Sequence, residues 1–149
     1  MILCGTVAAR HCMQFMTPLK TFIVEDSPII LENLTATLEE LADVRVVGSV
    51  QDETSAVQKI RSGVHDFDLM IIDIFLKSGS GLGVLRAAQD AGVKALRVVL
   101  TNYATADIRK RCADLGAARV FDKSSELEDL IDYCIRIAAG TATVPGDLR

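Results

Sequence analysis

The chain has 149 residues, which is enough for one compact domain with its own hydrophobic core. Its 16 Lys and Arg and 20 Asp and Glu give a net charge of −4, so electrostatics offers no reason to expect DNA binding. No apolar run approaches the roughly 20 residues that span a bilayer, and no signal peptide pattern opens the sequence. We therefore expect a cytoplasmic protein that binds neither DNA nor a membrane.

We divide the chain into an N-terminal extension at 1–18, one folded domain at 19–139 and a tail at 140–149. We expect the extension to be poorly ordered, and Met16 is an alternative start. None of the four cysteines forms a Cys-x-x-Cys pair, which favours reduced thiols. Two of them, Cys112 and Cys134, fall on apolar helical positions, and His11 with Cys12 is only a weak metal candidate.

Short apolar runs alternate with segments of helical periodicity from residue 20 onward. The runs predict five strands, at 21–24, 44–50, 69–72, 96–100 and 118–121. The helical segments follow each strand, beginning at 28, at 53, after the glycine-rich loop 78–81, before 108 and after 125. This strict alternation predicts an α/β fold, a doubly wound parallel sheet with helices on both faces. One common strand order of such sheets is 2-1-3-4-5, and we expect this chain to adopt it.

Two helix starts carry recognisable capping residues. Ser27 is an expected N-cap, and Pro28 occupies the first helical position, where its missing N–H costs nothing. Ser125 and Glu128 match a capping box for the last helix. The apolar stripes of these two helices are expected to contain Leu31, Leu34, Leu38 and Leu41 in the first, and Leu127, Leu130, Ile131, Cys134 and Ile135 in the last.

Polar residues stand at the carboxyl ends of four of the five strands, the edge where open parallel sheets bind their ligands. They are Glu25 with Asp26, Asp73, Thr101 and Lys123. In the expected strand order the first and third strands are neighbours, so three carboxylates crowd together and resist ionising at once. A divalent cation relieves that repulsion, and Mg²⁺ suits a site with a few carboxylates and several waters.

This set of groups is what phosphoryl transfer to a carboxylate requires. Asp73 would be the nucleophile, and the metal with Lys123 would spread charge away from the phosphoryl oxygens. Thr101 would hydrogen-bond one of those oxygens, and backbone N–H groups after Asp73 and Thr101 would hold others. Each residue taken alone has an ordinary structural explanation, such as a helix cap or a solvated lysine. Only their combination at four strand ends favours a functional site.

The sequence resembles the receiver domains of two-component response regulators over about residues 19–139. The segments that carry the resemblance are Ile23-Val24-Glu25-Asp26-Ser27, Ile71-Ile72-Asp73-Ile74-Phe75-Leu76, Val99-Leu100-Thr101-Asn102 and Asp122-Lys123-Ser124, with Gly81 eight residues after Asp73. The resemblance implies a flavodoxin-like fold, and a histidine kinase or phosphotransfer protein as the donor of a phosphoryl group to Asp73.

The same resemblance assigns further roles. Asp26, Asp73 and the backbone carbonyl of Phe75 would bind Mg²⁺ directly, while Glu25 would act mostly through water. Thr101, Lys123 and the backbone N–H of Asn102 would bind the phosphoryl group and switch the domain between two packings. The protein would then be a signalling phosphoacceptor rather than an enzyme, apart from weak self-catalysed phosphorylation and dephosphorylation.

Several positions depart from the family pattern. The aromatic switch position, three residues before the lysine, holds Val120, and the adjacent Phe121 is expected to point to the opposite face of the sheet. Lys77 and Ser124 replace frequent prolines. Phe75 and Tyr103 stand two residues beyond the acceptor and the threonine. We expect their bulk to limit access of water and to lengthen the life of the phosphorylated state.

The downstream partner is expected to be a protein that binds the face built by the fourth helix, fifth strand and fifth helix, and a homodimer through that face is a further option. Without a second domain, the chain reads as a single-domain response regulator. The alternatives are a degenerate receiver that only binds partners, an aspartyl-phosphate hydrolase of the haloacid-dehalogenase type, and a flavin carrier. Phe75 stands where such a hydrolase needs an Asp, and Glu25-Asp26-Ser27-Pro28 would repel a flavin phosphate.

Overall fold

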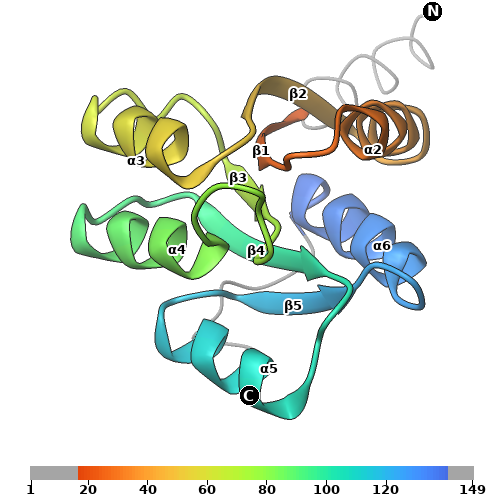
Figure 1. Cartoon of the computed structure of the whole chain (residues 1–149). Coiled ribbons are helices and arrows are strands. Elements are labelled where there is room, and N and C mark those ends of the chain that lie inside the picture. The colour runs from red at the N-terminus through yellow and green to blue at the C-terminus, as the bar shows by residue number, and fades with distance from the viewer. Residues whose placement is uncertain (1–16, 141–149) are drawn as a thin grey trace, which may run out of the picture.

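A computed structural model describes residues 17–140, and it contains one five-stranded parallel sheet in the order β2-β1-β3-β4-β5 (Figure 1). This confirms the predicted strand order. The elements are β1 Leu19–Val24, α2 Pro28–Leu41, β2 Val44–Val50, α3 Glu53–Arg61, β3 Leu69–Ile72, α4 Gly81–Asp90, β4 Leu96–Thr101, α5 Ala106–Asp114, β5 Arg119–Asp122 and α6 Leu127–Ala138.

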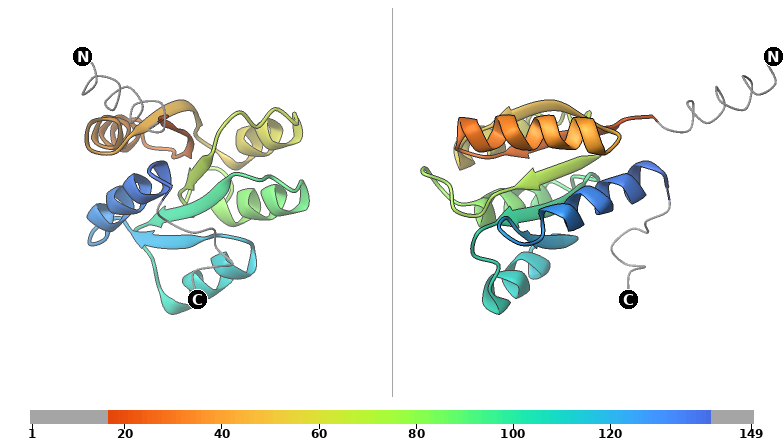
Figure 2. Two further views of the ribbon diagram at one scale, coloured as in Figure 1. Left: turned by 180° about the vertical axis from the view of Figure 1, so that it is seen from behind. Right: turned by 90° about the vertical axis from the view of Figure 1, so that its right-hand side faces the viewer.

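The helices form one layer on each side of the sheet (Figure 2). Helices α2 and α6 cover one face, and α3, α4 and α5 cover the other. The central strand β3 explains why both layers are needed, because all four of its residues are buried. Leu69 and Ile71 join the core beneath α2 and α6, whereas Met70 and Ile72 join the core beneath the other three helices.

The start of α2 confirms the sequence prediction, but the start of α6 corrects it. Ser27 caps α2, and its hydroxyl oxygen accepts a hydrogen bond from the N–H of Ile30. Helix α6 begins after Glu126, which makes no side-chain capping hydrogen bond, so the predicted capping box of Ser125 and Glu128 is wrong. The Glu126 carboxylate instead accepts a hydrogen bond from the N–H of Asp122 at the end of β5.

Two residues assigned to apolar stripes are exposed. Leu41 is 57% exposed because it is the last residue of α2, where the chain leaves the helix. Ile135 is 42% exposed because it lies about 140° around α6 from the buried Leu130, at 100° per residue. The buried stripe of α6 includes Tyr133 instead, a residue that the sequence analysis did not assign to the core.

Both cysteines within the described part, Cys112 and Cys134, are free and buried as predicted. The burial raises the thiol pKa to about 11 for Cys112 and about 12 for Cys134, so both are inert at neutral pH. No helix between residues 17 and 140 is long and apolar enough to cross a membrane. Cys4, His11, Cys12 and Met16 lie outside the described residues, and the division at 1–18, 19–139 and 140–149 stays a prediction.

Candidate functional site

The backbone ladder of the sheet places the first and third strand ends beside each other. Val24 and Ile72 are direct neighbours in the register of β1 and β3. The ladder continues one step further, since the N–H of Asp73 donates to the carbonyl of Val24 at 3.0 Å. Glu25, the next residue after Val24, therefore lies against Asp73, as the strand order predicted.

Lys123 reaches across from the end of β5 to these acids. Its N–H donates to the carbonyl of Thr101, which fixes the lysine beside the end of β4. Its Nζ lies 2.7 Å from Oε1 of Glu25 and 2.9 Å from Oδ2 of Asp73. All three side chains are largely buried, so the two ion pairs are shielded from water. The pairing of Lys123 with Glu25 was not foreseen from the sequence.

Burial and the ion pairs act in opposite directions on these groups. Burial raises the pKa of Glu25 above its usual value, although the hydrogen bond from Lys123 works against that rise. Burial alone would lower the pKa of Lys123, but its hydrogen bonds to Glu25 and Asp73 outweigh this and raise it. The site therefore keeps the lysine charged.

The donor set fits a hard divalent cation. Glu25, Asp26 and Asp73 each offer a carboxylate oxygen, and these oxygens lie within 4.8 Å of one another. Asp26 is partly exposed, so the cluster opens to solvent on its side. Mg²⁺ is bound in this way, through one or two carboxylates with retained waters. The acidic cluster can thus hold a metal ion.

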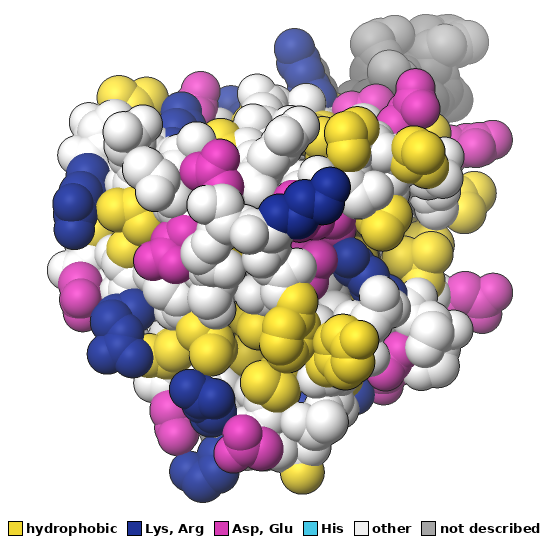
Figure 3. Space-filling view, viewed as in Figure 1, with side chains coloured by type: hydrophobic (Ala, Val, Ile, Leu, Met, Phe, Trp, Pro, Cys, Tyr) yellow, Lys and Arg dark blue, Asp and Glu magenta, His cyan; other side chains and the backbone are white. Residues whose placement is uncertain are grey.

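All eight residues that the sequence analysis placed in the site line one cavity of about 210 Å³, together with Ser27 and Ile30. They are Glu25, Asp26, Asp73, Phe75, Thr101, Asn102, Tyr103 and Lys123. Figure 3 shows the corresponding hollow, where acidic and basic side chains meet beside a hydrophobic band. The sequence analysis therefore identified every strand end that contributes to this cavity.

Two exposed aromatic rings form the mouth of this cavity. Phe75 and Tyr103 are 51% and 60% exposed, and they meet edge to face with 4.8 Å between ring centroids. Their contact joins the chain after β3 to the chain after β4. Beneath them, the hydroxyl of the fully buried Thr101 accepts a hydrogen bond from the N–H of Tyr103 at 3.3 Å.

The loop after β3 requires its glycine. A Cβ atom on Gly81 would lie 2.8 Å from the Cα of Ile74 and would also collide with the carbonyl of Asp73. Only glycine lets the start of α4 approach the acceptor position so closely. This gives a physical reason for a glycine eight residues after Asp73.

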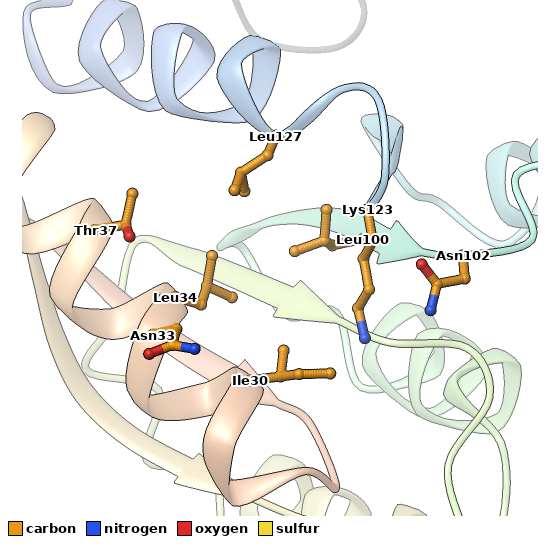
Figure 4. A pocket seen from close by; sticks show the side chains of 8 residues that line it. All are labelled: Ile30, Asn33, Leu34, Thr37, Leu100, Asn102, Lys123 and Leu127. Atoms are coloured by element: carbon orange, nitrogen blue, oxygen red, sulfur yellow. The ribbon is translucent and has the colours of Figure 1, made fainter.

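A second cavity, of about 270 Å³, adjoins the first between α2 and α6 (Figure 4). Leu34 from α2, Leu100 from β4 and Leu127 from α6 form apolar parts of its wall, and Asn33, Thr37, Asn102 and Lys123 contribute polar groups. Ile30, Asn102 and Lys123 line both cavities, so the two adjoin at the lysine. An apolar group of a partner that occupied this cavity would lie next to the acidic cluster.

Comparison with known proteins decides the family. The family described as response regulator receiver domain matches residues 21–135. The chain belongs to the response regulator receiver domain family. A curated relative, the nitrate/nitrite response regulator NarP of Escherichia coli, is 31% identical over 117 residues, which are 78% of this chain and 53% of the relative.

Other relatives carry receiver domains in different proteins. A protein-glutamate methylesterase/protein-glutamine glutaminase of Azospirillum brasilense is 30% identical over 115 residues, which are 76% of this chain and 29% of the relative. The receiver described here therefore spans about half or less of these two proteins. The signal receiver domain of NarL from Mycobacterium tuberculosis has the same flavodoxin-like fold, with a TM-score of 0.71 and 20% identity over 83% of this chain and 98% of that one.

The structure confirms that Phe121 points to the opposite face of the sheet from Val120. This ring is buried in the core beneath α2 and α6, tilted against Tyr133 with 5.8 Å between centroids. Val120 is half-buried and packs against the opposite core. No aromatic side chain of β5 therefore lies on the side of α5, where the family's switch residue would stand.

Two residues near the site make contacts that were not predicted from the sequence. Glu53, the first residue of α3, accepts a hydrogen bond from the N–H of Ser80 in the loop after β3. Arg109 of α5 donates to the carbonyls of Ala104 and Val120 and to the carboxylate of Glu126. Neither belongs to a motif, and apart from Ala104 their partners lie 11 to 27 residues away along the chain, so no local pattern marks these contacts.

Proposed function

We propose that Asp73 accepts a phosphoryl group from a phosphohistidine of a histidine kinase or a phosphotransfer protein. A carboxylate oxygen of Asp73 forms the new P–O bond as the donor's P–N bond breaks, and the histidine leaves as a neutral imidazole after taking up a proton. The observation that carries the proposal is the ion pair between Lys123 and Asp73 inside the acidic cluster. It holds the carboxylate in place and supplies a fixed positive charge beside it.

The groups around Asp73 have matching roles in this proposal. Asp26, Asp73 and the backbone carbonyl of Phe75 hold Mg²⁺, with Glu25 acting mostly through water. The bound cation supplies positive charge against the charge that builds up on the phosphoryl oxygens. Lys123, the hydroxyl of Thr101 and the backbone N–H of Asn102 donate hydrogen bonds to the same oxygens.

The donor protein approaches from the side of α2 and α6 in this proposal. Ile29 and Ile30 at the start of α2 are 71% and 37% exposed, and Ile30 lines the second cavity together with Leu127. A donor that places its histidine at Asp73 covers this surface, where exposed apolar side chains favour a protein contact. The donor's specificity would then depend on this cavity.

The output in this proposal is a change of shape that a second protein detects. Thr101 ends β4 and Lys123 directly follows β5, so their contacts with a phosphoryl group bias the packing of α5, β5 and α6. We propose that this face binds a protein partner or a second copy of the chain. The net charge of −4 favours a protein partner over DNA, and the free buried thiols suit a cytoplasmic location.

The test is incubation with acetyl phosphate and Mg²⁺, followed by intact mass measurement. We expect one added phosphoryl group on the wild type and on the control Asp90→Asn, and none on Asp73→Asn or without Mg²⁺. Phosphorylation of Asp73→Asn would place the acceptor elsewhere. A wild type that never gains mass would instead favour the degenerate receiver, and continuous turnover of a phosphate ester would favour the hydrolase.

A further inference from the structure

The loop between β3 and α4 is held from outside the site by the first residue of α3. Figure 1 shows α3 and α4 side by side. The N–H of Glu53 donates to the carbonyl of Ser78 at 3.2 Å, and Oε1 of Glu53 accepts from the N–H of Ser80 at 2.8 Å. Glu53 therefore holds the loop by hydrogen bonds of both its backbone and its side chain.

Two glycines make the space that the Glu53 side chain occupies. A Cβ atom on Gly83, in the first turn of α4, would lie 2.8 Å from Oε1 of Glu53 and would collide with the rest of its carboxylate. A Cβ atom on Gly79 would collide with the Cβ of Glu53. Gly79 also has a φ of +84°, which favours glycine. The carboxylate thus fits the surface formed by this loop and the start of α4.

A short chain of contacts connects Glu53 to the acceptor. Ser80 pairs with Phe75 in an antiparallel bridge, and the N–H of Phe75 donates to Oδ1 of Asp73 at 3.3 Å. On the same loop, the N–H of Lys77 donates to Oδ2 of Asp26 at 2.7 Å. The loop that Glu53 holds therefore orients the carboxylates of Asp26 and Asp73.

We infer that Glu53 is a positioning residue for phosphoryl transfer, acting through the loop at 75–80 on Asp26 and Asp73. The inference rests on the proposed function and adds a residue to its machinery. Glu53 touches neither the acceptor nor the cation site. Its effect is to hold the carboxylates in the geometry that a cation and a phosphoryl group need, and outer-shell hydrogen bonds of this kind commonly change activity or metal affinity by 10- to 100-fold.

Two substitutions remove the hydrogen bond between the Glu53 carboxylate and the N–H of Ser80 in independent ways. Glu53→Ala deletes the carboxylate, and Gly83→Ala expels it by occupying its space. Gly83→Ala also replaces a helical glycine with the best helix former, so helix propensity alone would stabilise the protein. We expect each variant to slow Mg²⁺-dependent phosphorylation by acetyl phosphate on the order of tenfold. The double variant should be no slower than Glu53→Ala alone, because the group that Gly83→Ala displaces is already absent.

Two further variants separate positioning from stability. Glu53→Gln keeps an oxygen that can accept from Ser80, so it should restore most of the rate. Asp52→Ala removes the N-cap of α3, whose carboxylate accepts from the N–H of Ser55, and leaves the contacts of the loop intact. It should lower the melting temperature without slowing phosphorylation. Amide exchange at Ser80 and Lys77 should accelerate in Glu53→Ala and not in Asp52→Ala.

The possible outcomes distinguish this inference from the proposed function. If the wild type is phosphorylated and Glu53→Ala matches its rate, the positioning role is wrong while the proposed function stands. If Asp52→Ala slows the reaction as much as Glu53→Ala does, Glu53 contributes only to stability, and the inference is likewise overturned. If the wild type takes no phosphoryl group under any condition, both conclusions fail together.

Discussion

The two halves of the site are held in different ways. The acidic half follows β1 and β3, and its loop is fixed by backbone hydrogen bonds to Asp26 and Glu53. The half after β4 carries Asn102 and Tyr103 on an exposed loop, and one long side chain, Arg109, links that loop to β5. The loop of the acidic half is thus held by residues that follow β1 and begin α3, whereas the loop after β4 is held by the partly exposed side chain of Arg109.

This difference matches the separate tasks that we propose. A cation and an acceptor need carboxylates in one fixed geometry, which the hydrogen bonds from the backbone N–H groups of Phe75 and Lys77 provide. A switch needs a segment with two packings close in free energy, which an exposed loop with one tether permits. Lys123 and the contact between Phe75 and Tyr103 are the two links between the halves.

The largest effect is expected from removing the lysine. Lys123→Met leaves Glu25 and Asp73 buried without their cation, so we expect the free energy of unfolding to fall by about 3 kcal/mol in EDTA. Saturating Mg²⁺ should recover part of the loss, because a divalent cation replaces the missing charge. Denaturant titrations with and without Mg²⁺ measure both quantities. The control Lys77→Met removes an exposed lysine nearby and should change little; an equal loss there would show that the buried pairs are not responsible.

The second link, the contact between Phe75 and Tyr103, is expected to limit the access of water to phosphorylated Asp73. Phe75→Asn places a hydrogen-bonding amide at the mouth of the cavity, so we expect the phosphorylated protein to lose its phosphoryl group faster, on the order of tenfold. Release of inorganic phosphate from purified phosphoprotein measures the half-life. Tyr103→Phe keeps the edge-to-face contact and should leave the half-life unchanged. A half-life of seconds in the wild type, with no response to Phe75→Asn, would contradict the role of these rings.

Removing the side chain of Arg109, which links the loop after β4 to β5, should have a smaller effect. Arg109→Met removes hydrogen bonds to Ala104, Val120 and Glu126, and we expect a loss of about 1 kcal/mol, since the arginine and Glu126 side chains are 41% and 32% exposed. Amides at 102–105 should exchange faster, while the affinity of the acidic half for Mg²⁺ stays the same. Lys110→Met is the matched control, because Lys110 pairs only at the surface with Asp114. A weaker Mg²⁺ affinity in Arg109→Met would show that the halves are not separable.

The smallest effect concerns pH. The hydrogen bond from Arg109, with that from the N–H of Asp122, holds the pKa of Glu126 below its usual value of 4.5. The stability gained from Glu126 is therefore fully present above pH 4.5 and is lost as pH falls through the lower folded-state pKa. Wild type should exceed Glu126→Gln by less than about 1 kcal/mol at neutral pH, and the two should converge in acid. Urea titrations across this range measure the difference, which should shrink in an Arg109→Met background.

Much of the fold and of the site could be predicted from local patterns. Alternating apolar runs and helical stripes specify a doubly wound sheet, and the sheet brings strand ends together. That is why Asp26, Asp73, Thr101 and Lys123 could be assigned to one cavity from the sequence. The start of α6 could not be predicted, because Glu126 is held by Asp122 and Arg109 rather than by the residues of a capping box.

The sequence by itself determined the alternation of strands and helices and the chemistry at the strand ends, because both depend on periodicity and on residue type. Only the tertiary structure decided which partner each charged group takes. Lys123 pairs with Glu25 as well as with Asp73. Glu53 forms hydrogen bonds with Ser78 and Ser80, which are 25 and 27 residues away along the chain. Such contacts join segments that meet only after the sheet has formed, and no spacing along the chain records them.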